Sequence, residues 1–191
     1  MTVEGLDLSH ALEERGALLQ GHFRLSSGRH SPQFIQKFRI LEMPPLVERV
    51  AAAIAAKFKD AHPNVVLSAA VGGIILGYEV ARQLGVRAIF VEKEDGVPVL
   101  RRGFALGPDD AALVVEDVIT TGRSVREVLD VARTEGARVV GVGAIVRREP
   151  VDFGVPTVAL VDVRIPSFAP EECPQCKAGE AITEPGSRFL R

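Results

Sequence analysis

One short segment combines carboxylates, hydroxyls and a glycine in an order that suits the binding of a sugar phosphate. An apolar run over residues 111–115 ends in Glu116 and Asp117, and the sequence Val-Ile-Thr-Thr-Gly-Arg-Ser fills positions 118–124. Turn amides, hydroxyls and the positive end of a helix dipole together favour phosphate binding. Acids repel a phosphate, but they accept hydrogen bonds from the hydroxyls of an attached ribose. The segment therefore predicts a ribose-phosphate site.

The surrounding elements would place both parts of this site at one edge of a sheet. Val125, Val128, Leu129 and Ala132 follow helical spacing, so the Thr/Gly/Ser turn lies at a helix N-terminus. The apolar run is typical of a strand, with the two acids exposed at its tip. A strand with solvated acids and an ordinary capped helix is the simpler alternative, but the ordered string of residue types is far more restrictive. A Walker-type loop is excluded, because no Gly-x-x-x-x-Gly-Lys-Ser/Thr sequence occurs.

Strand and helix patterns alternate along most of the chain. Strands are predicted at 65–69, 87–91, 111–115, 139–146 and 157–163, with helices at 44–59, at 75–84 and after residue 124. This alternation predicts an α/β fold with a parallel sheet covered on both faces. Residues 92–102 are polar and read as a loop, with Asp95-Gly96 as a turn signal.

The first forty or so residues do not follow that alternation. Asp7 or Ser9 can cap a helix from Leu12 to Leu19, and residues 21–38 suggest two short strands around a polar loop. Together with the tail from Pro166, these residues are expected to form a hood over the carboxyl edge of the sheet. We expect a single domain over residues 1–191, with the hood at about 1–42 and 166–191 and the core at about 43–165.

The composition is that of an ordinary globular protein. Of the 191 residues, 47% are hydrophobic and 25% are charged, which allows a substantial core. The net charge of −2 argues against nucleic acid and anionic membranes as partners. No apolar run reaches the roughly 18–20 residues of a membrane span, and the N-terminus lacks a signal-peptide pattern, so we expect a cytoplasmic protein.

Two cysteines lie near the C-terminus in the sequence Cys173-Pro-Gln-Cys176. This spacing occurs in halves of zinc sites and in redox pairs. The chain has no second cysteine pair, and its histidines show no ligand spacing, so we expect a structural or incidental pair. A four-thiolate zinc site shared between two subunits is the alternative. The histidines are His10, His22, His30 and His62. Tyr78, the single tyrosine, is expected to fill the core.

The segment at 113–124 resembles the phosphoribosyl-diphosphate (PRPP) signature of the type I phosphoribosyltransferases. Residues 23–35, which read Phe-Arg-Leu-Ser-Ser-Gly-Arg-His-Ser-Pro-Gln-Phe-Ile, are similar to the hood of the orotate phosphoribosyltransferases. The resemblance spans nearly the whole chain and implies the type I phosphoribosyltransferase fold. It also implies the Mg²⁺-dependent transfer of ribose 5-phosphate from PRPP to orotate, which gives orotidine 5′-monophosphate and pyrophosphate in UMP biosynthesis.

The same resemblance implies roles for individual residues. PRPP would be held by Glu116, Asp117, Val118, Ile119, Thr120, Thr121, Gly122, Arg123, Ser124, Gly72, Gly73 and Lys93. Orotate would contact Thr120, Arg148, Ser26, Phe34 and Ile35. The Arg148 guanidinium would fork onto the 6-carboxylate of orotate, although a solvated strand end remains the alternative for the Arg147–Arg148 pair. Mg²⁺ would be held by PRPP oxygens and water, with no direct protein side-chain ligand.

The family's cations are rearranged in this chain. Ser26 and Gly72 stand where many family members have lysine, and Arg147 stands where an aspartate is usual. In the lid at residues 92–102, only Lys93 matches the family's basic run. Arg101 and Arg102 are therefore expected to supply the remaining positive charge for catalysis. In the family this lid closes over the neighbouring subunit, which implies a homodimer with shared active sites.

Two other functions fit part of the pattern. The PRPP signature also occurs in enzymes that use uracil or a purine, but the hood and Arg148 favour orotate. A non-catalytic PRPP-sensing regulator that binds RNA or DNA would need a basic face or an added DNA-binding domain. The balanced charge and the chain length favour neither.

Overall fold

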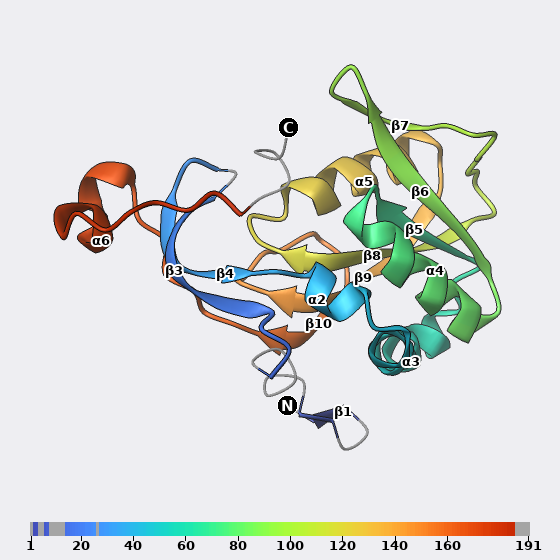
Figure 1. Cartoon of the computed structure of the whole chain (residues 1–191). Coiled ribbons are helices and arrows are strands. Elements are labelled where there is room, and N and C mark those ends of the chain that lie inside the picture. Colours follow the sequence, from blue (N-terminus) through green and yellow to red (C-terminus); the bar gives the residue numbers. More distant parts are fainter. Residues whose placement is uncertain (1, 4–5, 8–13, 26, 186–191) are drawn as a thin grey trace.

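The computed structural model of the protein describes residues 2–3, 6–7, 14–25 and 27–185 (Figure 1). Its centre is a six-stranded sheet with the order β10-β9-β8-β5-β6-β7. The strands are β5 (Val65–Ala69), β6 (Arg87–Glu94), β7 (Val97–Leu100), β8 (Ala111–Ile119), β9 (Arg138–Arg147) and β10 (Thr157–Asp162). All neighbours pair in parallel except β6 and β7, which form an antiparallel hairpin. The predicted α/β fold and its five parallel strands are confirmed.

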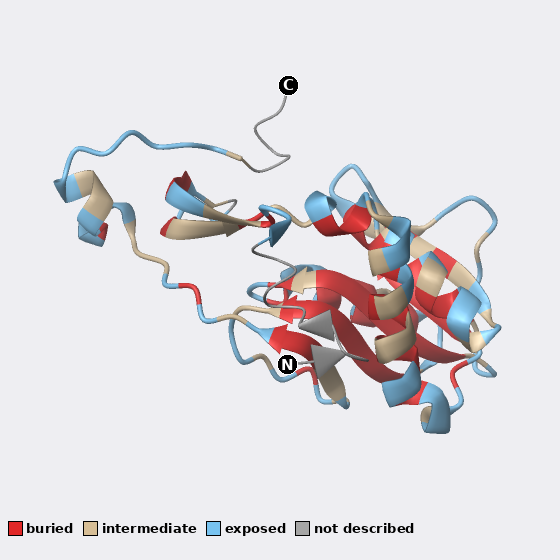
Figure 2. Cartoon of the chain, turned by 60° about the horizontal axis from the view of Figure 1, so that its bottom comes forward, coloured by how far each residue is buried: buried red, intermediate tan, exposed pale blue. Residues whose placement is uncertain are grey.

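Helices cover both faces of the sheet and give it two apolar cores (Figure 2). Helices α3 (Pro44–Phe58) and α4 (Gly72–Leu84) pack on one face, and α5 (Arg123–Thr134) packs on the other. Side chains of β8 alternate between them, since Leu113 belongs to the α3–α4 core and Val114 to the α5 core. Burial on both faces explains why the central strands read as continuous apolar runs.

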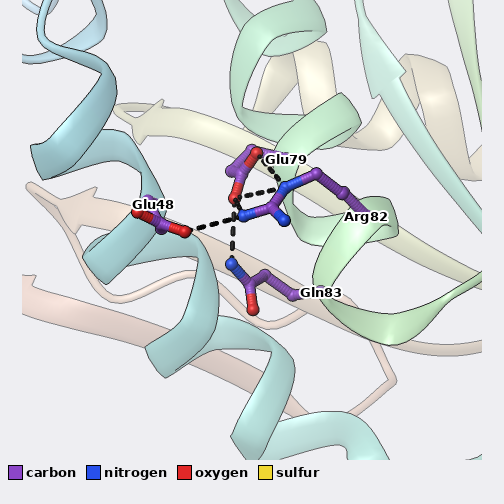
Figure 3. A network of polar contacts seen from close by, with 4 residues as sticks. All are labelled: Glu48, Glu79, Arg82 and Gln83. Carbon is purple, nitrogen blue, oxygen red and sulfur yellow. Dashed lines mark hydrogen bonds and ion pairs between the residues drawn. The ribbon is translucent and has the colours of Figure 1, made fainter.

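A polar network joins α3 to α4 at their solvent-exposed side (Figure 3). The Arg82 guanidinium donates to Glu79 on its own helix and to Glu48 on α3, at 2.7 and 2.8 Å. Gln83 also donates to Glu79. Exposed ion pairs of this kind contribute about 0.2–1 kcal/mol each. The network therefore orients the two helices, while the apolar core beneath them supplies most of the stability.

The hood is a hairpin held by the C-terminal tail. Strand β3 (Leu18–Arg24) pairs with β4 (His30–Ile35) in antiparallel register. The tail bonds to both strands through the main chain: Thr183 N donates to His22 O at 2.8 Å, and His30 N donates to Phe168 O at 2.9 Å. Between these two contacts lie η2 (Pro170–Glu172) and α6 (Pro174–Lys177). Helix α2 (Phe38–Leu41) leads from the hairpin to α3.

The start of the chain differs from the sequence prediction. Leu18 and Leu19 belong to β3, so the expected helix from Leu12 to Leu19 is wrong at its C-terminal end. Gly16 explains the break, because its φ of 61° is a left-handed conformation that ends a helix. Asp7 lies in the short strand β2 (Leu6–Asp7), which pairs with β1 (Thr2–Val3). The predicted positions Ser9, Leu12 and Ser26 lie outside the described residues.

The predicted polar loop at residues 92–102 is also corrected, because most of it is the β6–β7 hairpin. Asp95 and Gly96 form its turn, with φ values of 51° and 84°, as the turn signal indicated. The strands escaped notice because β7 is a short edge strand whose charged neighbours face solvent. None of the helices in the described ranges is long and apolar enough to cross a membrane.

Tyr78 is not a core residue. Its side chain lies on the outer face of α4 and is 65% exposed, as are Val71 at 74% and Ile75 at 46%. These residues follow one another at helical spacing, so they form an apolar stripe along α4. Phe38 of the neighbouring α2 is exposed to a similar extent. The prediction that Tyr78 fills the core is wrong because it rests on the residue type alone, whereas burial depends on which face of α4 the residue occupies.

Candidate active site

The two acids of the predicted site lie inside β8 and are buried. Glu116 is 7% exposed and Asp117 is 1% exposed. The expectation of exposed acids at a strand tip is therefore wrong. The strand continues to Ile119 because residues 116, 118 and 119 still pair with β9. Both carboxylates accept main-chain hydrogen bonds, Glu116 from Asp117 N at 3.0 Å and Asp117 from Val118 N at 2.7 Å.

A lysine from the hood neutralises Asp117. Lys37 Nζ donates to Asp117 Oδ1 at 3.0 Å and lies 2.7 Å from Oδ2, although Oδ2 makes no hydrogen bond of good geometry. The Lys37 side chain is one-third exposed, so its charge also faces the open side of the site. Lys37 is not predictable from the sequence, because a single lysine between a strand and a helix carries no motif and its partner is 80 residues away.

Glu116 is held in an unusual electrostatic environment. Burial, together with the neighbouring Asp117 charge, raises the pKa of its carboxyl group from 4.5 to about 8. Lys37 and the Asp117 amide oppose this shift without cancelling it. Near neutral pH the Glu116 carboxyl group is therefore mostly protonated. Paired carboxylates of this kind can accept and donate hydrogen bonds to a diol such as ribose.

Gly72, at the start of α4, packs directly against this ion pair. A Cβ atom added there would overlap with Asp117 Oδ2 and Lys37 Nζ. A Cβ on Gly73 would come within 3.1 Å of Ser68 Cβ. Gly72 therefore lets the backbone approach Asp117 more closely than any other residue could, and Gly73 does the same for Ser68. The N-terminus of α4 thus lies next to Asp117, and the first amides of a helix can bind an anion.

The predicted phosphate turn lies at the N-terminus of α5. Gly122 is the residue before the helix, with φ of 76°, and a Cβ there would meet the Phe153 ring at 2.8 Å. Thr120, Thr121 and Ser124 are exposed, and no side chain of the described residues caps the first amides of α5. The turn thus leaves exposed hydroxyls next to the first amides of α5. Its role in phosphate binding, which the sequence predicts, stays a prediction.

The two arginines at the end of β9, Arg147 and Arg148, have different environments. Arg147 forms a bidentate pair with Asp162, at 2.7 and 3.1 Å. Arg148 N donates to Ile119 O at 2.9 Å, which ties Arg148 to the end of β8. Its Nε is buried and has no hydrogen-bond partner, and burial lowers the pKa of its guanidinium. Buried donors without partners are rare in folded proteins, so Arg148 is the arginine available to an anionic ligand.

Known proteins with this architecture place the chain in a family. The phosphoribosyl transferase domain family matches residues 38–150, more than half of the chain. An orotate phosphoribosyltransferase of Pelotomaculum thermopropionicum is 50% identical over 93% of this chain and 95% of its own length. Another, of Heliobacterium modesticaldum, is 51% identical over 90% and 92%.

This chain belongs to the orotate phosphoribosyltransferase family. The crystal structure of such an enzyme from Aeropyrum pernix agrees in fold, with a TM-score of 0.70 and 26% identity over 82% of this chain and 94% of that chain. The type I phosphoribosyltransferase fold expected from the sequence is thereby confirmed.

The lid cations of the orotate phosphoribosyltransferase family have acidic partners in this chain. Lys93 pairs with Glu127 of α5, which also binds Arg123. Arg102 pairs with Glu92 at 3.1 Å, and Arg101 lies between Glu92 and Glu94. Each of the three cations is thus tied to an acid of its own subunit. Pyrophosphate would have to compete with these exposed pairs, which are weak.

The two predicted base contacts of β4 differ in accessibility. Phe34 is half-buried and packs against Phe23, with ring centroids 5.8 Å apart. Ile35 is 7% exposed and packs into the α3–α4 core. The structure therefore leaves Phe34 open to a ligand and uses Ile35 to anchor the hairpin to the core.

Proposed function

We propose that this protein catalyses the reaction of orotate with PRPP to give orotidine 5′-monophosphate and pyrophosphate. The observation that carries the proposal is Arg148, whose buried Nε lacks a partner beside the phosphate turn. A guanidinium in that state matches the carboxylate of orotate, which uracil and purines lack. The family membership and the names of the relatives support the same acceptor.

In the proposed reaction the chain mainly positions and shields its substrates. The bond from ribose C1′ to pyrophosphate oxygen breaks, and its electron pair leaves with pyrophosphate. The anionic orotate supplies the electron pair for the new C1′–N bond from the opposite face. Glu116 and Asp117 would hold the ribose hydroxyls, and the turn at residues 120–124 would hold the 5′-phosphate. Catalysis then rests on positioning and on stabilisation of the leaving group.

Pyrophosphate is proposed to lie against Gly72 and Gly73, whose amides begin α4. Within the described chain, this site contains no group of three or more carboxylate, histidine or cysteine ligands. That donor set fits a Mg²⁺ ion held by PRPP oxygens and water, not by a protein cage. When bound, Mg²⁺ supplies charge neutralisation on pyrophosphate. When PRPP binds, the Lys37 ammonium group would leave Asp117 and contact the pyrophosphate group, which adds a positive charge from the hood.

We further propose a cytoplasmic homodimer, which would form through the apolar stripe on α4. Val71, Ile75, Tyr78 and the nearby Phe38 are exposed. Contiguous apolar residues at a helix face usually mark an interaction surface. A dimer there would join two copies next to Gly72, so a lid from one subunit could reach the site of the other. Lys93, Arg101 and Arg102 would then act in the neighbouring site.

The decisive experiment follows orotate consumption by absorbance with PRPP and Mg²⁺, and compares Arg148→Ala with Arg147→Ala. Truncating a partner of a buried charge contact costs about 2–5 kcal/mol, so Arg148→Ala should lower kcat/KM for orotate by about 30-fold or more, with little change for PRPP. Arg147→Ala removes an exposed pair with Asp162 and serves as the matched control.

Two results would reject the proposal. Faster turnover of uracil, adenine or hypoxanthine than of orotate would reject the acceptor. Tight PRPP binding with no turnover of any base would indicate a regulator and not an enzyme. If only Arg147→Ala lowered kcat/KM for orotate, Arg147 and not Arg148 would bind the orotate carboxylate.

A further inference from the structure

Two histidines and two cysteines from distant parts of the chain meet in the hood. His22 is on β3 and His30 on β4, and the hairpin register brings their rings to a centroid distance of 5.1 Å. The tail adds Cys173 and Cys176 at α6. One ligand atom from each residue lies within 4.8 Å of all the others. The expectation that the histidines have no ligand spacing is therefore wrong for this pair, because the spacing arises from strand pairing and not from the sequence.

Four of the six distances between these ligand atoms match the edges of a tetrahedral metal site, and the other two are within 4.8 Å. A zinc ion holds nitrogen at about 2.0 Å and sulfur at about 2.3 Å, so tetrahedral ligands lie about 3.3 Å apart for two nitrogens and about 3.6 Å for nitrogen and sulfur. The two imidazole nitrogens, His22 Nε2 and His30 Nδ1, are 3.2 Å apart. His22 Nε2 is 3.4 Å from Cys173 Sγ and 3.6 Å from Cys176 Sγ, and His30 Nδ1 is 3.2 Å from Cys176 Sγ.

Hydrogen bonds alone do not satisfy this arrangement. His22 Nδ1 lies 2.9 Å from Glu180 O, and since a carbonyl only accepts, Nδ1 carries the proton. In the neutral ring Nε2 is then an acceptor with a single lone pair, yet it has three polar neighbours at contact distance. If His30 Nδ1 donates to it, His30 can no longer accept from Cys176. One cation placed among the four atoms satisfies all of them at once.

The Glu180 carbonyl has the role that outer-shell groups have in metal sites. Metal-binding histidines commonly donate their second ring N–H to a carbonyl or carboxylate, which fixes the tautomer and the ring direction. Gln175 helps to hold Glu180 in place, because its Nε2 donates to the Glu180 side chain (Oε2) at 2.7 Å and to the main-chain oxygen of Gly21 at 3.2 Å. The histidine is thus oriented before any ion binds.

We propose that His22, His30, Cys173 and Cys176 bind one zinc ion within a single chain. The donor set, two thiolates and two imidazoles at tetrahedral spacing, is that of structural zinc sites. His22, His30 and Cys173 are at most 5% exposed, and all four positions are filled by protein, so no position is open for a substrate. The ion therefore serves the fold and takes no part in phosphoribosyl transfer.

The ion would join the two segments that make up the hood. The hairpin and the tail meet through a few main-chain hydrogen bonds, and α6 projects away from the sheet (Figure 1). Few apolar side chains are buried where the hairpin and the tail meet. Small elements with so little core commonly depend on a metal or a disulfide. A bound zinc would hold β3, β4 and the tail in one arrangement, and with them the ligand-facing Phe34.

The direct test is the metal content of untagged protein purified from cells grown with zinc. Elemental analysis should give about one zinc per chain for the wild type, as expected for a closed structural site. Cys176→Ser and His30→Ala should retain less than about a tenth of this amount. His62→Asn is the matched control, because His62 is exposed, lies outside the cluster and has a φ of 49° that asparagine tolerates.

A second measurement on the wild type keeps the proposal testable if those variants fold poorly. The zinc is removed by a chelator under reducing conditions, and Co²⁺ is added. Four-coordinate Co²⁺ with two thiolates should give intense visible absorption bands and a thiolate charge-transfer band in the near ultraviolet. Two reactive thiols in wild-type protein that binds neither zinc nor Co²⁺ would overturn the proposal. A Cys173–Cys176 disulfide in protein purified without added oxidant would overturn it as well.

Discussion

At the scale of single residues, the site is built around a buried ion pair between the hood and the sheet. Asp117 is almost fully buried, whereas Lys37 is partly exposed. If the ion pair is broken, the Lys37 ammonium group can therefore be solvated by water, but the Asp117 carboxylate cannot. Because the residues of this pair come from the hood and from β8, the pair links the hood to the sheet.

Asp117→Asn tests this pair. The amide cannot accept two charged hydrogen bonds from ribose hydroxyls, and such contacts contribute about 1.5–3 kcal/mol, so kcat/KM for PRPP should fall ten- to a hundredfold. The midpoint of thermal unfolding should fall only slightly, because Lys37 can rehydrate. Asp162→Asn, which breaks the exposed pair with Arg147, should leave PRPP kinetics unchanged. Wild-type PRPP kinetics in Asp117→Asn would remove the residue from the site.

Glu116 makes a second residue-scale prediction, about pH. Its pKa is raised in the folded protein, so the folded state keeps a proton that the unfolded state loses above about pH 4.5. The free energy of unfolding should therefore fall as pH rises from about 4.5 to about 8, by up to about 5 kcal/mol. Glu116→Gln should flatten this dependence in urea titrations, whereas the exposed Glu135→Gln should not. A wild-type stability that rises over this range would contradict the assignment.

At the scale of elements, the α4 N-terminus shows how backbone packing can determine a site. Gly72→Ala should push the new Cβ into Asp117 and Lys37, and overpacking of this kind costs about 1–3 kcal/mol. We expect both lower stability and a larger loss of PRPP affinity than in Gly107→Ala, where the Cβ would meet nothing within 4 Å. Calorimetry with PRPP measures both quantities. Equal affinities for the two variants would show that the backbone at Gly72 does not face the ligand.

Some of the helices, strands and site residues could be predicted from the sequence, and others could not. The strands at 65–69, 139–146 and 157–163 and the helix from Pro44 were found, because apolar runs and proline are local signals. The turn before α5 at residues 120–124 was found for the same reason. Three features were missed. The contact of Lys37 with Asp117 and the His–Cys cluster join segments that are more than 75 residues apart. The burial of the two acids depends on where β8 ends, and no local sequence pattern gives either kind of information.

At the scale of the whole molecule, the lid raises the question of which site it serves. Replacing Lys93, Arg101 and Arg102 together by alanine should lower kcat by about 10²–10³, as loss of leaving-group stabilisation does. Mixed with Asp117→Asn and allowed to exchange subunits, this variant should regain about a quarter of wild-type activity, because half of the dimers then contain one intact site. No recovery after verified exchange would mean that each lid acts on its own subunit. A monomer at assay concentration would rule out sharing altogether.

The main-chain hydrogen bonds between the β3–β4 hairpin and the C-terminal tail also determine the order in which parts of the protein fold during synthesis. Residues 22 and 30 emerge from the ribosome early, yet their main-chain partners are residues 168 and 183, close to the end of the chain. The six strands of the sheet precede Pro166 and can assemble before those partners appear. Contacts of such long sequence separation form slowly and late. The nascent protein can therefore assemble its sheet first, and the hood is completed only after residues 168 and 183 have emerged.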